Sequence, residues 1–294
     1  MATIVVGIDG SEGAKAALAW ACRAAHHEPG SKIVAVSTWL SSVPAPSPWF
    51  AGYDLPMDLT EITRAELQAA VAAVEAERGT TEIEQRVVCG SAASVLIAEG
   101  VAADMLVVGS RGVGGFKGLL LGSVSNQVVA HAQCPTVVVP RVSEEDRTAS
   151  SATNSIVVGV DGSANSISAL QWAARFARGS GATVRAVYVW RYPPVALAAT
   201  PLGTGVPRPE LISDAAVEEL QGFLAESALP SDVRFEAVVR EGPPAQVLLE
   251  EGRHTDLLVV GARGHEGFVG LLLGSVATAV AHHTPCPLAV IPDV

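Results

Sequence analysis

Two glycine-rich stretches carry the clearest chemical signal in the sequence. Residues 109–123 read GSRGVGGFKGLLLGS, and residues 261–275 read GARGHEGFVGLLLGS. Each follows a short apolar run that is typical of a buried strand and leads into a segment with helical periodicity. Glycine lets backbone N–H groups approach a ligand closely, and a helix start offers unpaired N–H donors with a partial positive charge. Both stretches are therefore suited to holding phosphate.

A second pattern, IVVGxDGS, occurs at residues 4–11 and again at 156–163, and it places Asp9 and Asp161 directly after an apolar run. Asp161 follows Asp9 by 152 residues, and the two glycine-rich stretches are separated by the same 152 residues. The constant offset indicates a tandem duplication. An aspartate at this position can also be only a turn residue, because its side chain often accepts a hydrogen bond from the backbone two residues on.

Composition excludes several classes of protein. The chain has 294 residues, of which 49% are hydrophobic and 17% charged, and its net charge is −11, so we expect no basic surface for nucleic acid or anionic membrane. Its four cysteines have no metal-type spacing, and no run approaches the roughly 20 apolar residues of a membrane span. The first residues lack the basic and apolar segments of a signal peptide. We expect a cytoplasmic protein with reduced thiols and no metal site.

Each half alternates apolar runs with helical periodicity. In the first half we expect strands at residues 3–9, 32–39, 82–88, 104–109 and 135–140, and helices at 12–27, 59–78, 94–101 and 123–131. This alternation predicts a parallel sheet with helices on both faces, and the second half repeats the plan. The polar residues 143–154 predict a linker between a first domain, 1–142, and a second domain, 155–294. A proline-rich loop at 40–57 is expected to cover the site or a partner.

Two common phosphate loops do not fit the glycine-rich stretches. A P-loop requires GxxxxGK[ST], but Lys117 is followed by Gly118, and the second copy has Val269 in place of the lysine. A dinucleotide fingerprint places GxGxxG after the first strand, where this chain has Asp9, whose carboxylate would repel pyrophosphate. What remains in both copies is the pattern G-x2-G-x9-G-[ST] after the fourth predicted strand.

With this pattern, the IVVGxDGS opening and a CPxxVxP closing strand in register in both halves, the chain resembles the universal stress protein family over almost its whole length. The ATP-binding branch of that family carries the same glycine pattern. The resemblance implies two tandem Rossmann-like, flavodoxin-type α/β domains, each with a five-stranded parallel sheet in strand order 3-2-1-4-5. Because the first and fourth strands are neighbours in that order, Asp9 and Gly109 are expected to flank one crevice at the switch point of the sheet.

The resemblance implies ATP, with or without Mg2+, as the bound cofactor, and it suggests a role for each part of the crevice. The aspartates contact the nucleoside end, main-chain groups at the end of the second strand read the adenine edge, and a glycine after the third strand lies close by. The phosphates lie along residues 109–115 and 261–267 and at the following helix starts. The expected site residues are Gly7, Asp9, Thr38, Gly90, Gly109, Ser110, Arg111, Gly112, Val113, Gly114, Gly115, Gly122, Ser123, Val124 and Ser125 in the first domain, and Gly159, Asp161, Val189, Gly242, Gly261, Ala262, Arg263, Gly264, His265, Glu266, Gly267, Gly274, Ser275 and Val276 in the second.

The two copies differ inside the predicted site. The second copy loses a hydroxyl and a lysine and gains a carboxylate, through the pairs Ser125 and Ala277, Lys117 and Val269, and Gly114 and Glu266. We therefore expect weaker binding in the second domain. The proline-framed runs at 135–140 and 287–292 predict edge strands, which invite pairing with another domain. In the family such an edge commonly mediates dimerisation, so the resemblance implies that the two halves form a pseudo-twofold unit within the chain. It further implies that two such chains associate as a homodimer.

Three functions remain open at this point. The first is an ATP-binding regulator or sensor of stress or growth, with an unidentified protein partner and at most slow ATP hydrolysis, because no repeated carboxylate or histidine is placed to activate water. The second is an enzyme that cleaves ATP between the α and β phosphates or adenylylates a substrate, although enzymes of that class carry their phosphate loop after the first strand. The third is an interaction scaffold that binds no nucleotide.

Overall fold

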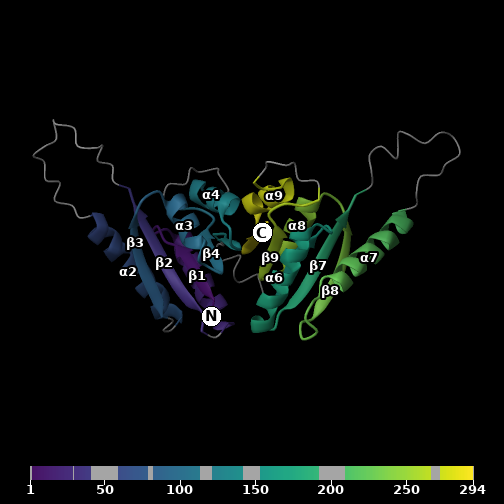
Figure 1. Ribbon diagram of the computed structural model, residues 1–294, viewed down its shortest axis with the longest axis horizontal. Helices are drawn as coiled ribbons and strands as arrows, with labels where there is room; N and C mark the ends of the chain where they lie inside the picture. Colours follow the sequence, from purple (N-terminus) through teal and green to yellow (C-terminus); the bar gives the residue numbers. More distant parts are fainter. Residues whose placement is uncertain are drawn as a thin grey trace, which may run out of the picture. The chain divides into compact units, whose positions relative to one another are not determined.

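The computed structural model describes residues 2–28, 30–40, 59–78, 82–112, 121–141, 153–191, 209–265 and 272–293. The chain divides into two compact units, Met1–Arg141 and Val142–Val294, which are considered separately below. Residues 41–57 of the predicted loop and residues 143–152 of the predicted linker lie outside the described residues. Figure 1 shows the helices and strands of each unit.

The first unit alternates strands and helices along the chain. Its elements are β1 (Thr3–Gly7), α1 (Glu12–His26), β2 (Lys32–Trp39), α2 (Leu59–Arg78), β3 (Ile83–Cys89), α3 (Ala92–Gly100), β4 (Met105–Gly109), α4 (Ser123–His131) and β5 (Thr136–Val139). The strands form a parallel sheet in the order β3-β2-β1-β4-β5, which confirms the predicted fold class and strand order. Helices α1 and α2 pack together, as do α3 and α4, so each face of the sheet carries one pair.

The second unit repeats this arrangement. Its elements are β6 (Ser155–Val160), α6 (Ala164–Ser180), β7 (Thr183–Trp190), α7 (Pro209–Glu226), β8 (Phe235–Glu241), α8 (Pro244–Gly252), β9 (Leu257–Gly261), α9 (Ser275–His283) and β10 (Leu288–Ile291). The strands are again parallel, in the order β8-β7-β6-β9-β10. The tandem repeat predicted from the sequence is therefore also a repeat in structure.

The central strands hold each core together. Val5 and Val6 of β1 and Leu106 and Val107 of β4 are almost completely buried, because helices cover both faces of the sheet at these strands. Burial of each such side chain contributes about 1.5–3 kcal/mol. Strand β1 ends at Gly7, two residues earlier than predicted, and this leaves Asp9 in the turn that leads into α1.

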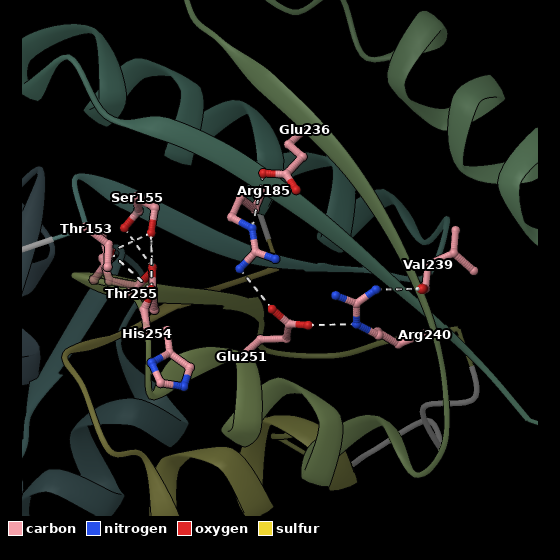
Figure 2. Close-up of polar contacts among 10 residues, drawn as sticks. Thr153, Ser155, Arg185, Glu236, Val239, Arg240, Glu251, His254 and Thr255 are labelled. Atoms are coloured by element: carbon pink, nitrogen blue, oxygen red, sulfur yellow. Dashed lines mark hydrogen bonds and ion pairs between the residues drawn. The ribbon is translucent and has the colours of Figure 1, made fainter. Parts of the chain in front are cut away.

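Ion pairs connect one helix of each unit to strands of its sheet. In the second unit, Glu251 of α8 lies between Arg185 of β7 and Arg240 of β8, with N–O distances of 2.8 Å to each (Figure 2). In the first unit, Glu99 of α3 has the same role and pairs with Arg86 of β3 at 2.6 Å. The carboxylate occupies the same position in both units and pairs with an arginine of the third strand in each, at different positions along that strand, and Glu251 has a further partner in Arg185 of β7. Among the described residues, no helix combines the length and apolarity that a membrane span requires.

Candidate functional site

The candidate site of the first unit lies where the winding of the sheet reverses. Strand β1 pairs with β2 on one side and with β4 on the other, so the chain leaves β1 and β4 in opposite directions. Ligands of parallel α/β sheets bind beyond the carboxyl ends of strands at such a point. The carboxyl ends are Gly7, two residues before Asp9, and Gly109, the first residue of the glycine-rich stretch. The structure therefore brings the Asp9 turn and the glycine-rich loop to one place.

Asp9 lies directly against the glycine-rich loop. Its Oδ1 accepts a hydrogen bond from the N–H of Ser11 at 3.0 Å, which is the contact expected of a turn residue. A Cβ on Gly112 would overlap Asp9 Oδ2 and lie 3.3 Å from its Cγ. Only glycine permits this approach, so the turn and the loop form one continuous surface.

Asp161 lies against the loop of the second unit in the same way, because a Cβ on Gly264 would overlap its Oδ2. Its Oδ2 accepts from the N–H of His265 at 3.0 Å, and its Oδ1 accepts from the N–H and Oγ of Ser163 at 3.0 and 2.6 Å. Burial alone would raise the pKa of Asp161, but these hydrogen bonds to the carboxylate outweigh it and hold the pKa below its ordinary value. The side chain is therefore charged at neutral pH and can accept hydrogen bonds from ligand hydroxyls.

Gly109 allows the glycine-rich loop to pack closely against α1. A Cβ there would lie 2.6 Å from the carbonyl carbon of Gly13 and 2.7 Å from its oxygen, and a Cβ on Gly13 would lie 2.5 Å from Arg111 O. The backbone of the loop thus rests on the first turn of α1, where Ser11 Oγ also donates to Arg111 O at 3.4 Å. At Gly7 a Cβ would lie 2.8 Å from Leu96 Cδ1 of α3, which is the end of a flexible side chain. Close packing against backbone therefore explains Gly109 without a ligand.

Gly122 lies where the loop enters α4, and its own N–H donates to Ser110 O at 2.7 Å. It is the N-cap of α4 and provides no side-chain acceptor for the first-turn N–H groups, whereas α1 is capped by Ser11 Oγ. The next residue, Ser123, is exposed, and Val124 is half-buried. Helix α9 begins in the same way, with Gly274 as its N-cap, followed by exposed Ser275 and half-buried Val276. Such helix starts can bind an anion.

Two of the predicted loop amides are already engaged by the sheet. Ser110 is buried, and its N–H donates to Val139 O of β5 at 2.8 Å. Ala262 is buried as well, and its N–H donates to Ile291 O of β10 at 2.7 Å. Ser125 is also buried, and its Oγ donates to Gly109 O at 2.6 Å, so this hydroxyl braces the loop. The candidate donors in the described part of the first unit are therefore the N–H groups of Arg111 and Gly112 and those of the first turn of α4.

The remaining predicted residues lie along the same edge of each sheet. Thr38 and Val189 are half-buried at the ends of β2 and β7. Gly90 follows β3 at φ +153° and donates to Trp39 O at 2.9 Å, and Gly242 follows β8 at φ +143° and donates to Trp190 O at 3.0 Å. Gly159 lies against the side chain of Leu248, the equivalent of Leu96 beside Gly7. At Gly264, a Cβ would overlap Asp161. Val113, Gly114, Gly115, Glu266 and Gly267 lie outside the described residues.

Two differences between the units were missed in the sequence. Asn165 stands in the second unit where Gly13 stands in the first; it is buried, and its Oδ1 accepts from the N–H of Arg263 at 3.3 Å. The Arg263 side chain pairs with Asp293, 2.5 Å from Nη2 to Oδ2, and the counterpart of Asp293 in the first unit is Arg141. The Gly261 backbone also packs on Asn165, because a Cβ built on Gly261 would lie 2.9 Å from Asn165 Cγ. The constant offset of 152 residues identifies both exchanges, but their contacts are visible only in the structure.

Fold and site together define a class of tandem α/β proteins whose glycine-rich loop follows the fourth strand of each parallel sheet. Among the described residues, no group of three or more histidine, cysteine, aspartate or glutamate side chains could hold a metal ion. The sequence profile of the universal stress protein family matches residues 1–140 and 153–292. The chain therefore belongs to the universal stress protein family.

Individual relatives agree with this placement. A universal stress protein of Mycolicibacterium smegmatis is 31% identical over 295 residues, covering 98% of this chain and 96% of the relative. Universal stress protein Rv2623 of Mycobacterium tuberculosis is 32% identical over 298 residues, covering 98% and 95% of the two chains. The crystal structure of a universal stress protein from Archaeoglobus fulgidus has a TM-score of 0.63 over 99% of this chain and 98% of its own, at 19% identity. That structure supports the fold alone.

Proposed function

We propose that the protein is an ATP-binding regulator whose two domains, 1–142 and 155–294, each carry a nucleotide site, with residues 143–154 as the linker. The observation that supports this best is the contact between Asp9 and the Gly112 backbone, beside a helix start without a side-chain cap. This arrangement places a carboxylate that can accept hydrogen bonds from nucleoside hydroxyls next to backbone N–H groups that can donate to phosphate, at the switch point of the sheet. The same combination recurs at Asp161 and Gly274.

In this proposal the phosphates of ATP lie against the N–H groups of Arg111 and Gly112 and of the first turn of α4. Ser123 adds an exposed hydroxyl at the same place. The amide of Ser110 takes no part, because it is engaged by β5. Asp9 accepts hydrogen bonds from the nucleoside, and the main chain at Thr38 reads the adenine edge. Bound ATP would join the loop to α4, so occupancy can change the surface that a protein partner meets.

The second site is proposed to bind ATP more weakly. The Asn165 side chain already accepts from the Arg263 N–H, whereas its counterpart Gly13 has no side chain to accept from Arg111. In addition, Asp293 neutralises the Arg263 guanidinium, which would otherwise attract phosphate. A ligand at this site must therefore displace contacts that the protein already makes.

The direct test is to identify and titrate the nucleotide. Purified protein is denatured by heat, the released small molecules are identified by mass spectrometry, and nucleotide-free protein is titrated with ATP in a calorimeter. We expect an adenine nucleotide, and one tighter and one weaker site per chain. Two indistinguishable sites would contradict the proposed asymmetry. The absence of any adenine nucleotide, bound or titratable, would refute ATP binding and favour a scaffold.

Turnover and assembly complete the proposal. Incubation with ATP is expected to yield at most slow release of ADP, and rapid release of AMP and pyrophosphate would instead indicate an ATP-cleaving enzyme. We also propose that the chain acts in the cytoplasm as a homodimer. Sedimentation velocity with and without ATP measures the assembly, and a monomer at all concentrations would refute that part.

A further inference from the structure

An aromatic side chain lies on the Asp161 turn of the second unit. Gly162, which follows Asp161, has φ +79°, and a Cβ built there would lie 2.7 and 2.9 Å from Cε1 and Cε2 of Phe223 in α7. The ring therefore packs on the face of the turn and leaves no room for a methyl group between them. In the proposed function this turn holds the nucleoside.

Tyr188 of β7 supports the Phe223 ring. The two ring centroids are 6.0 Å apart with an interplanar angle of 52°, a favourable tilted geometry. The Tyr188 hydroxyl donates to Glu219 Oε2 of α7 at 2.8 Å. Burial, together with the carboxylates of Glu219 and Asp161, raises the pKa of Tyr188 to about 12, so this hydroxyl keeps its proton at neutral pH. Tyr188 also directly precedes Val189, whose main chain is proposed to read the adenine edge.

The first unit lacks both aromatic residues at the corresponding positions. The buried positions of α2 and α7 follow the same spacing, with Leu67 matching Leu220, so Ala70 corresponds to Phe223. Strands β2 and β7 both end at a tryptophan, so Ser37 corresponds to Tyr188. Among the described residues, nothing lies within 4 Å of a Cβ built on Gly10, the counterpart of Gly162. The same side of the Asp9 turn is therefore clear of described protein atoms.

We propose that Phe223, supported by Tyr188, fills the nucleoside position of the second site, so that ATP enters this site only when the ring turns away. The inference rests on the proposed function and identifies a residue that decides which of the two sites is occupied. It is independent of the loop contacts of Asn165 and Asp293, because those lie at the phosphate end. The first site, with alanine at position 70, takes ATP without this rearrangement.

Reciprocal substitutions test the inference. Phe223→Ala is expected to tighten the weaker site at least tenfold, about 1.4 kcal/mol, and to leave the tighter site unchanged. Ala70→Phe is expected to weaken the tighter site by a similar factor. Titration of each variant with ATP, alone and in backgrounds in which Gly122→Ala or Gly274→Ala weakens one site, assigns each affinity to a unit. Phe223→Leu keeps an apolar side chain without the ring and replaces Phe223→Ala if that variant does not fold.

The outcomes separate this inference from the proposed function. If the first site binds ATP but removal of the Phe223 ring leaves the second site unchanged, the inference alone fails. A loss of affinity at the second site would also overturn it, because it would mean that the ring stacks on the base. If neither site of the wild-type chain binds an adenine nucleotide, the proposed function and the inference both fail.

Discussion

Replacing Gly122 with alanine is expected to weaken ATP binding in the first unit while leaving its fold intact. The residue has φ −72° and ψ 159°, which alanine adopts readily. The new Cβ would lie 3.4 Å from Ser110 O and 3.6 Å from Arg111 Cα, distances that need little adjustment. Because alanine is a poorer N-cap than glycine, the free energy of unfolding should fall by about 0.5–1 kcal/mol.

The effect on ATP should be larger. The methyl group would occupy the junction of the loop and α4, where the proposed site presents its N–H groups to phosphate. Loss of one hydrogen bond to a charged group is worth about 1.5–3 kcal/mol, which corresponds to roughly a 10- to 150-fold weaker affinity. Gly274→Ala is the matched substitution in the second unit, where the Cβ would lie 3.4 Å from Ala262 O. It should leave the first site at its wild-type affinity.

Gly109→Ala is the informative contrast. Its Cβ would lie 2.6 Å from the carbonyl carbon of Gly13 and 3.1 Å from the N atom of Ala14, and both atoms belong to the backbone of α1. The helix cannot yield as a flexible side chain can, so we expect a loss of about 1–3 kcal/mol in the free energy of unfolding. Weaker ATP binding in this variant would therefore report distortion of the loop as well as lost contacts.

Urea unfolding followed by tryptophan fluorescence, with calorimetric titration of ATP on the same samples, distinguishes the two variants. Gly122→Ala should unfold close to the wild-type midpoint with a weakened first site, and Gly109→Ala should unfold at a clearly lower urea concentration. Wild-type ATP affinity in Gly122→Ala would refute the proposed phosphate position. A destabilisation equal to that of Gly109→Ala would refute the packing argument.

Three further predictions concern stability and reactivity. Glu251→Gln should lower the free energy of unfolding of the second unit by about 2 kcal/mol in urea titrations, because two arginines lose a largely buried carboxylate. The control Asp232→Asn, in a solvent-exposed ion pair, should cause no measurable change, and equal effects of the two substitutions would contradict this account. Because the folded-state pKa of Asp161 is lowered, the charged side chain stabilises the fold fully above the ordinary pKa of 3.8, and this stabilisation is lost as the pH falls below that value. Asp161→Asn should therefore flatten the dependence of Tm on pH in acid, and an unchanged slope would refute this prediction. Maleimide should label only Cys89 rapidly in the folded chain, because the other three cysteines are buried. Mass spectrometry detects the labelled thiols, and rapid labelling of a second cysteine would contradict the burial of these three side chains.

The sequence was sufficient to predict the helices and strands because the signals for them are local or repeated. Apolar runs bounded by glycine and polar turns predicted the strands, and the limits of α2 and α4 agree with the predicted ranges. The strand order came from the resemblance, and the structure confirms it. The contact of Asp9 with Gly112 follows from that order, because neighbouring parallel strands end at the same edge.

The functions of single glycines were harder to predict. The spacing of Gly109, Gly112 and Gly122 suggests one phosphate loop, yet Gly109 is required by α1 and Gly112 by Asp9, and only Gly122 has ordinary space around it. These reasons depend on atoms about 100 residues away along the chain. A local pattern therefore shows that glycine is needed but not what it must approach. The same limit explains why the contacts of Asn165 and Phe223 were not foreseen.

The differences between the units have a common direction. At four positions of the crevice the second unit has a side chain that makes an internal contact where the first unit has a smaller or differently charged residue: Asn165 for Gly13, Tyr188 for Ser37, Phe223 for Ala70 and Asp293 for Arg141. Each exchange gives the second unit a larger or oppositely charged side chain that makes a contact inside the protein. The second unit should therefore depend less on nucleotide for its stability than the first.

This difference can be measured by hydrogen exchange of the intact chain. ATP at 100 times its dissociation constant should stabilise the first unit by about 2.7 kcal/mol, since stabilisation follows RT ln(1 + [L]/Kd). Exchange of β1 and β4 should slow accordingly, while that of β6 and β9 should change less at the same concentration, because their site is weaker. Phe223→Ala should increase the response of β6 and β9. An equal response of both units in the wild-type chain would mean that the internal contacts of the second site do not compete with ATP.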